Sequence, residues 1–141
     1  MDLDQALDFL AAHSRGVLAT IKRDGRPQLS NVTYLCRGDL VRVSVTDDRA
    51  KTRNLRRDPR ASLHVTTDRF WPYLVAEGTA EVGERSSEQG DPVGRELAEV
   101  YEQIAGPHPD WDEFYRAMVE ERRAVLSFRV ERAYGIVPGP T

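Results

Sequence analysis

Two hydrophobic periods divide the chain into helical and extended segments. Within residues 2–14 the apolar side chains recur every three or four positions and share one helical face: Leu3, Ala6, Leu7 and Leu10. From residue 17 onward, apolar and polar positions alternate, which is typical of half-buried strands. The clearest case is the segment 40–46, in which valines alternate with arginine, serine and threonine. The pattern therefore predicts an N-terminal helix followed by a series of strands.

The alternating segments predict six strands, most of them separated by turn residues. Asp24-Gly25 favours a hairpin after the first strand, and Gly38-Asp39 favours another before the third. The expected strands cover residues 17–22, 28–35, 40–46, 60–66, 73–82 and 124–130. One face of the fifth strand is made largely of small residues: Leu74, Ala76, Gly78 and Ala80. Small residues in a strand suit a tight bend of a barrel or a close partner surface.

Helical periods return near the C-terminus. Residues 93–105 carry a helical apolar pattern that ends at Gly106-Pro107. A second helix is expected to begin at Asp110, where Glu113 provides an aspartate version of the capping box. After the last strand, the chain from Tyr134 onward is expected to be a tail held by three turn-forming residues: Pro138, Gly139 and Pro140. Strands joined mainly by hairpins, with short helices between them, indicate a mainly β fold with peripheral α-helices, a small antiparallel barrel rather than a βαβ sheet.

Length and composition limit the classes of protein that need to be considered. A chain of 141 residues is expected to form one domain, 1–141, with a single core. Cys36 is the sole cysteine, which excludes an internal disulfide and a cysteine-built zinc site. The acidic N-terminus has no apolar signal region, and no apolar run approaches membrane-spanning length. We therefore expect a cytoplasmic protein without a membrane partner.

A basic stretch, Arg49 to Arg57, places five basic side chains in nine residues, although the whole chain has a net charge of −3. A short helix is expected here, with Asp47-Asp48 as possible caps and Pro59 beyond its end. Either a solvated, charged helical turn or an anion site facing a phosphate explains this composition. The acidic background favours a small anionic ligand and argues against a nucleic-acid partner.

Further polar and aromatic side chains suit binding rather than catalysis. The second strand carries groups that can hydrogen-bond the edge of a heterocycle: Gln28, Ser30 and Asn31. Trp71 and Tyr73 provide aromatic surface, either as core packing or as one wall of a cofactor cleft. No nucleophile elbow, phosphate-binding loop or dinucleotide fingerprint is present, and the three histidines have no metal-ligand spacing. No catalytic or metal-binding side chain is predicted.

Four segments follow one another in a characteristic order. They are Gly16-Val-Leu-Ala-Thr-Ile, Asp24-Gly-Arg-Pro-Gln-Leu-Ser-Asn31, Arg49-Ala-Lys-Thr-Arg-Asn-Leu and Ala76-Glu-Gly-Thr79. In this order they resemble the pyridoxamine-phosphate-oxidase-like split β-barrel superfamily, most closely the actinobacterial branch that uses the deazaflavin coenzyme F420 in place of FMN. The similarity extends over nearly the whole chain, including Trp111-Asp112, Tyr134-Gly135 and Pro138-Gly139. It implies a six-stranded antiparallel split β-barrel of the FMN-binding type.

The resemblance also implies a homodimer, with coenzyme clefts where two barrels meet. Lys51 and Thr52, helped by Arg49, are expected to hold the phosphate or the charged tail of the coenzyme. The ring system is expected to lie against Gln28, Ser30 and Asn31 and above Val43 and Ser44. The remaining implied contacts are two aromatic residues that close the pocket from the other subunit and two residues of the basic block: Trp71, Tyr73, Arg53 and Asn54.

The implied activity is transfer of a hydride from reduced F420 to a small acceptor, such as an enone or a similarly activated double bond. No essential catalytic side chain is implied, because the coenzyme carries the hydride and the protein supplies binding, orientation and exclusion of water. Two alternatives remain open: an FMN-binding flavoprotein of the same fold, and a protein that binds F420 without turnover.

Overall fold

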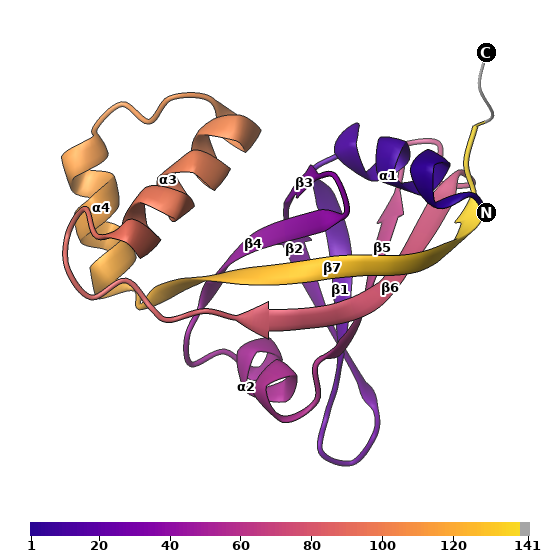
Figure 1. Ribbon diagram of the computed structural model, residues 1–141, viewed down its shortest axis with the longest axis horizontal. Coiled ribbons are helices and arrows are strands. Elements are labelled where there is room, and N and C mark those ends of the chain that lie inside the picture. Colours follow the sequence, from indigo (N-terminus) through magenta and orange to yellow (C-terminus); the bar gives the residue numbers. More distant parts are fainter. Residues whose placement is uncertain (139–141) are drawn as a thin grey trace.

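A strongly curled antiparallel sheet forms the body of the protein (Figure 1). The computed structural model describes residues 1–138, and within them seven strands are arranged in the order β2-β1-β5-β6-β7-β4-β3. The strands are β1 (Arg15–Ile21), β2 (Pro27–Thr33), β3 (Leu35–Arg37), β4 (Leu40–Thr46), β5 (Arg60–Thr66), β6 (Tyr73–Val82) and β7 (Arg123–Ile136). Because β2 and β3 follow each other in the chain yet lie at opposite ends of this order, the sheet curls into a half-barrel with a seam.

The predicted strand 28–35 is divided in the structure, so the described chain has seven strands and not the six expected. The division falls at Tyr34, which has no exposed surface. Its backbone N–H donates to the carbonyl of Ser14 at 2.8 Å, and its hydroxyl donates to the carbonyl of Leu10 at 2.8 Å. After this anchor the chain leaves β1 and pairs with β4, where Leu35 faces Arg42. Hydrophobic alternation continues through the crossover, which is why the sequence pattern does not reveal it.

The bend predicted from the small residues of β6 lies at Gly78. There the register between β6 and β7 shifts, since Glu77 pairs with Arg132 whereas Gly78 pairs with Val130. A Cβ atom on Gly78 would lie 1.9 Å from the carbonyl oxygen of Arg129, so only glycine permits this approach.

The last strand is longer than predicted. The expected strand ended at residue 130, but β7 continues to Ile136, and the expected tail residue Tyr134 pairs with Val75 of β6. The polar, exposed residues around Glu131 interrupt the apolar pattern and hide this extension from the sequence. Gly139 and Pro140, which were expected to hold the tail, lie outside the described residues.

Four helices accompany the sheet in the described chain. They are α1 (Leu3–Ala11), α2 (Ala50–Arg57), α3 (Pro92–Ala105) and α4 (Trp111–Glu120). Helices α1 and α2 lie near opposite ends of the half-barrel, whereas α3 and α4 form a hairpin beside it (Figure 1). None of the helices within residues 1–138 is long and apolar enough to cross a membrane.

The buried apolar side chains form two separate cores. The larger fills the half-barrel, where the inward residues of the strands meet Leu10 from α1 and Leu55 from α2. The smaller lies within the helical hairpin, where Leu97 and Phe114 pack against Val125 of β7. The inward valines predicted for residues 40–46 belong to the larger core.

Aspartates cap three of the helices, including both helices of the hairpin. The carboxylate of Asp91 accepts the backbone N–H of Gly94 at 2.7 Å and caps α3. Asp110 accepts the N–H of Glu113 at 3.2 Å and caps α4. The backbone N–H of Asp110 donates to Nδ1 of His108 at 3.0 Å, so the capping box predicted from Glu113 is only half formed.

Candidate functional site

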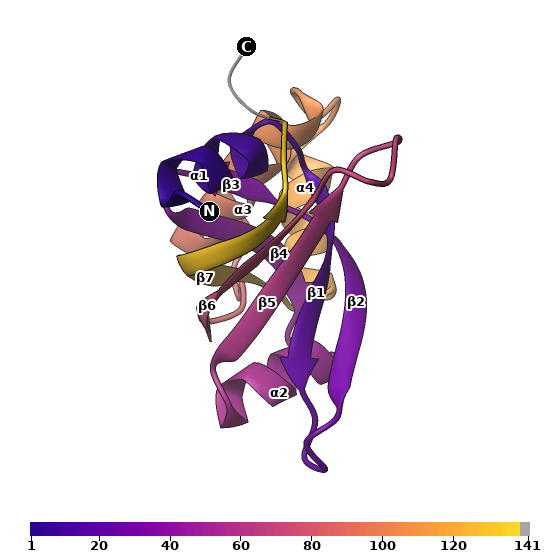
Figure 2. The ribbon, with the colours of Figure 1, turned by 90° about the vertical axis from the view of Figure 1, so that its right-hand side faces the viewer.

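A cavity of about 600 Å³ opens at the seam of the half-barrel, between β2 and β4. Its walls come from the outer surface of β1, β2 and β5, from the outward edge of β4 and from the first turn of α2. Figure 2 shows β2, β1 and β5 side by side, with α2 beneath them. Four residues predicted as coenzyme contacts border this seam cavity: Asn31, Val43, Ser44 and Lys51.

Basic side chains dominate the charge of the seam cavity. Lys51, Arg15 and Arg123 line it, and no acidic residue does. The pKa of Lys51 is lowered, first by burial of the ammonium group and then by repulsion from Arg49 and Arg123. Within residues 1–138 the Lys51 side chain makes no hydrogen bond or ion pair. A half-buried cation with cationic neighbours is stabilised by an anion, so this corner of the cavity suits a phosphate or a carboxylate.

The first turn of α2 adds to this preference. Arg49 occupies the N-cap position without a side-chain cap. The caps predicted at Asp47 and Asp48 do not form, because Asp47 pairs with Arg56 and the exposed Asp48 contributes only its carbonyl, to Arg53 at 2.8 Å. N–H groups at an uncapped helix start favour an anion.

Two residues of the basic block face the interior and not the cavity. Thr52 has no exposed surface, and its hydroxyl donates to the carbonyl of Thr46 at 3.1 Å. Asn54 is 7 % exposed, and its side-chain amide donates to the hydroxyl of Thr20 and to Oε1 of Gln28, each at 3.1 Å. These groups fasten α2 to β4, β1 and β2, and their polar atoms are already engaged.

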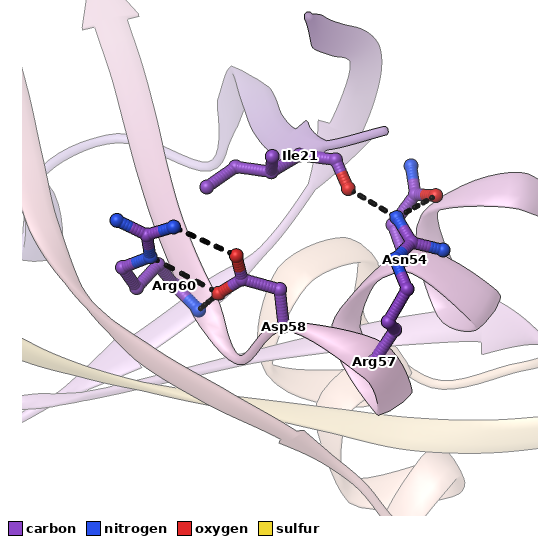
Figure 3. A network of polar contacts seen from close by, with 5 residues as sticks. All are labelled: Ile21, Asn54, Arg57, Asp58 and Arg60. Carbon is purple, nitrogen blue, oxygen red and sulfur yellow. Dashed lines mark hydrogen bonds and ion pairs between the residues drawn. The ribbon is translucent and has the colours of Figure 1, made fainter. Parts of the chain in front are cut away.

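The end of α2 is fixed by a second set of polar contacts (Figure 3). Arg57 donates to the carbonyl of Ile21 at 2.6 Å and to Oδ1 of Asn54 at 3.2 Å. Hydrogen bonds from Arg60 hold the pKa of the Asp58 carboxyl at about 2 as the chain turns into β5. The side chain of Arg57 is therefore engaged in holding the fold, and Lys51 is the basic residue of the block that lines the seam cavity.

The polar residues of β2 do not act as one group. Gln28 and Ser30 lie on the face of β2 that also carries buried Val32, whereas Asn31 lies on the opposite face. Asn31 pairs with Val17 of β1, and both line the seam cavity. Of the three residues predicted to line the ring system, the structure brings Asn31 to the cavity.

The two predicted aromatic residues lie at the β5–β6 hairpin, beyond the cavity. The ring of Tyr73 stacks on His64 with centroids 5.8 Å apart, and His64 lines the cavity. Trp71 is 75 % exposed and contacts Phe70 edge-on at 5.3 Å. Neither residue borders the cavity within the described chain.

Sequence reasoning missed five polar lining residues: Arg15, Thr33, His64, Thr66 and Arg123. His64 and Thr66 lie in the predicted strand 60–66, on the face of that strand that forms the cavity wall. Arg15 and Arg123 begin β1 and β7, and Arg123 reaches Lys51 because its strand pairs with the end of β4, where Thr46 faces Arg123. No local motif marks these positions, since the register of distant strands brings them together. Within residues 1–138, no group of acidic, histidine or cysteine side chains is arranged to hold a metal ion.

Comparison with known proteins agrees with this architecture. The sequence matches the pyridoxamine 5'-phosphate oxidase family over residues 3–136, and the chain therefore belongs to that family. A conserved hypothetical protein from Mycobacterium tuberculosis is similar in structure, with 27 % identity, a TM-score of 0.72 and coverage of 94 % of this chain and 82 % of that one. An F420 reductase superimposes with 22 % identity and a TM-score of 0.69, over 90 % of this chain and 94 % of that one. A heme-binding protein from Mycobacterium smegmatis does so with 24 % identity and a TM-score of 0.61, over 92 % of this chain and 51 % of that one.

Proposed function

We propose that the chain is an F420-dependent oxidoreductase, which binds the deazaflavin coenzyme in the seam cavity and reduces an enone or a similarly activated double bond. The observation that carries this proposal is Lys51, which lines a cavity of about 600 Å³, has no ion-pair partner within residues 1–138 and lies close enough to the charges of Arg49 and Arg123 for them to lower its pKa. A cavity of this size accommodates a tricyclic ring system, and the Lys51 ammonium suits the phosphate attached to it. Family membership and the fold shared with an F420 reductase support the same conclusion.

The residues of the chain have separate tasks in this proposal. Lys51 and Arg49, with the open N–H groups of the first turn of α2, hold the phosphate. Asn31 supplies an amide on the wall, and Val43 and Ser44 form the opposite side of the cavity. When bound in its reduced form, the deazaflavin supplies a hydride to one carbon of the acceptor double bond, solvent supplies a proton to the other, and the coenzyme becomes oxidised. No side chain is assigned a proton-transfer role.

We also propose that the protein is a homodimer through the outer face of the sheet. Successive pairings place one row of residues across five strands on this face: Asn31, Val17, His64, Val75 and Tyr134. Leu29, Tyr134 and Ile136 are exposed apolar residues of the same face. A sheet face that exposes these apolar residues among polar ones suits burial against a second copy. A partner on this face would lie beside the seam cavity, next to Asn31 and His64, and could carry its own Trp71 toward it.

The choice of ligand is tested by titrating the purified protein separately with oxidised deazaflavin, FMN and hemin. Tight binding of the deazaflavin with weak binding of FMN supports the proposal, and the reverse order supports an FMN-binding protein. A heme ligand is included because His64 lines the cavity and a heme-binding protein shares the fold. Oxidation of reduced deazaflavin by a panel of enones then distinguishes an enzyme from a protein that only binds the coenzyme.

A further inference from the structure

A second cavity, of about 620 Å³, lies between the helical hairpin and the half-barrel. It occupies the space between the two apolar cores, which do not merge. One wall is apolar and aromatic and comes from α3 and α4: Val100, Tyr101, Ile104, Phe114 and Met118. Its volume falls in the range of small-molecule sites.

This second cavity, called the hairpin cavity because α3 and α4 form one of its walls, adjoins the seam cavity. Four residues line both: Arg15, Thr33, Ser44 and Arg123. A molecule in the hairpin cavity therefore meets the proposed coenzyme across a shared border. Two cationic side chains, Arg123 and Arg15, lie at this border and differ in their polar contacts. Arg123 donates two hydrogen bonds to Glu121, at 2.9 and 3.1 Å, whereas Arg15 makes no hydrogen bond or ion pair within residues 1–138.

The hairpin side of the cavity offers aromatic faces and a histidine, together with two carboxylates, Glu113 and Glu121, of which Glu121 pairs with Arg123. His108 packs between the rings of Tyr101 and Phe114, with centroids 5.3 and 5.5 Å away. Because Nδ1 of His108 accepts the N–H of Asp110, the proton of the neutral ring lies on Nε2. The cavity thus has an aromatic end on the hairpin, where Glu113 also repels a carboxylate, and a cationic end, Arg15, on the border with the seam cavity.

We propose that the hairpin cavity binds the hydride acceptor, and that this acceptor is a flat aryl or cyclic compound with a carboxylate conjugated to its double bond. The ring lies against the hairpin wall and the carboxylate lies at Arg15, which places the double bond between them, at the border with the coenzyme. The role as acceptor site rests on the proposed function, whereas binding of an aryl carboxylate can be measured without the coenzyme.

The test uses trans-cinnamate as the probe, because it has an aromatic ring, a conjugated double bond and a carboxylate. The chain has two tryptophans, so protein labelled with 5-fluorotryptophan gives two ¹⁹F signals, and the variant Trp71→Phe assigns them. The ring of Trp111 lies 5.4 Å from that of Phe114 in the cavity wall, whereas Trp71 is on the distant β5–β6 hairpin. We expect a saturable shift of the Trp111 signal and an unchanged Trp71 signal.

Three comparisons make the test specific. Arg15→Gln is expected to weaken cinnamate binding about tenfold or more, since it removes a charge-assisted contact, and the neutral cinnamamide is expected to bind wild type about tenfold more weakly than cinnamate does. Ala105→Phe fills the mouth of the hairpin cavity at an exposed position that does not line the seam cavity. It is expected to abolish the Trp111 shift while deazaflavin affinity stays unchanged.

The inference is overturned if cinnamate does not shift the Trp111 signal, if Ala105→Phe leaves the shift intact, or if cinnamamide binds as tightly as cinnamate. Deazaflavin binding without cinnamate binding removes the inference and leaves the proposed function standing. Cinnamate binding at Trp111 in a protein that does not bind deazaflavin removes the proposed function and leaves an aryl carboxylate site.

Discussion

The side-chain amide nitrogen of Asn54 lies 3.1 Å from Oε1 of Gln28, which joins α2 to the edge strand β2. The same nitrogen donates to the hydroxyl of Thr20 at 3.1 Å, so the amide also holds α2 to β1. Gln28 and Asn54 come from two separate sequence motifs, and the structure shows that they bind each other. The contact positions the first turn of α2, and with it Lys51, at the seam cavity.

Asn54→Ala is expected to destabilise the protein by about 1–3 kcal/mol, because the buried Thr20 hydroxyl and the Gln28 amide oxygen lose their partner. Urea unfolding at a fixed protein concentration measures this cost. Arg53→Ala is the control, since this neighbouring side chain is exposed and its loss is expected to change stability by no more than about 0.5 kcal/mol. Equal stability of the two variants would contradict the conclusion that Asn54 stabilises the packing of α2 on β1 and β2.

The aspartate cap of α3 predicts that the protein loses stability in acid. Burial raises the pKa of Asp91, but hydrogen bonds from Ser86, Ser87, Glu88 and Gly94 outweigh burial and hold the pKa at about 2. A folded-state pKa below the ordinary value of 3.8 means that the ionised cap stabilises the fold above that pH, and that this stability is lost as pH falls through about 2.

Asp91→Ala is therefore expected to cost about 1 kcal/mol at neutral pH, with a smaller loss than wild type on acidification. Asp91→Asn keeps an oxygen at the cap but cannot titrate. Thermal unfolding between pH 5 and pH 2.5 follows these differences. Wild type and Asp91→Asn losing the same stability over this range would rule out the proposed ionised cap.

The exposed apolar residues of the outer sheet face predict that Tyr134→Glu converts a dimer into monomers, because it places a charge at the β7 end of that face, beside Ile136. Analytical ultracentrifugation measures the association state. Arg116→Glu, at an exposed position on α4, is the control and is expected to leave the dimer intact. A monomeric wild type would contradict the proposed dimer. A dimeric Tyr134→Glu variant would show that the dimer forms through another surface.

The lowered pKa of Lys51 predicts a pH dependence of anion binding. Because burial, Arg49 and Arg123 all favour the neutral amine, Lys51 loses its charge at a lower pH than an ordinary lysine, and affinity for a phosphate ligand falls as pH rises through that pKa. Lys51→Arg keeps its charge and is expected to show a flatter profile between pH 7 and pH 10. Identical profiles would assign the titration to the ligand or to another group.

The sequence predicts the mainly β architecture because alternation in segments such as 40–46 follows directly from burial of one sheet face. It does not predict the split at Tyr34, which depends on contacts with Leu10 and Ser14 from another part of the chain. The motif that contains Lys51 predicts its place at a ligand cavity, and Lys51 lines the seam cavity. Arg15 and Arg123 could not be assigned in this way, since strand register alone carries them to the cavity.

The titration of Lys51→Ala with oxidised deazaflavin tests the central claim most directly. Loss of a charge-assisted contact is expected to cost about 1.5–3 kcal/mol, which weakens binding roughly 10- to 150-fold. Lys22→Ala is the matched control, because Lys22 is the other lysine of the chain and is exposed away from the cavity. The account predicts wild-type affinity for Lys22→Ala and greatly reduced affinity for Lys51→Ala; equal affinities in both variants would contradict it.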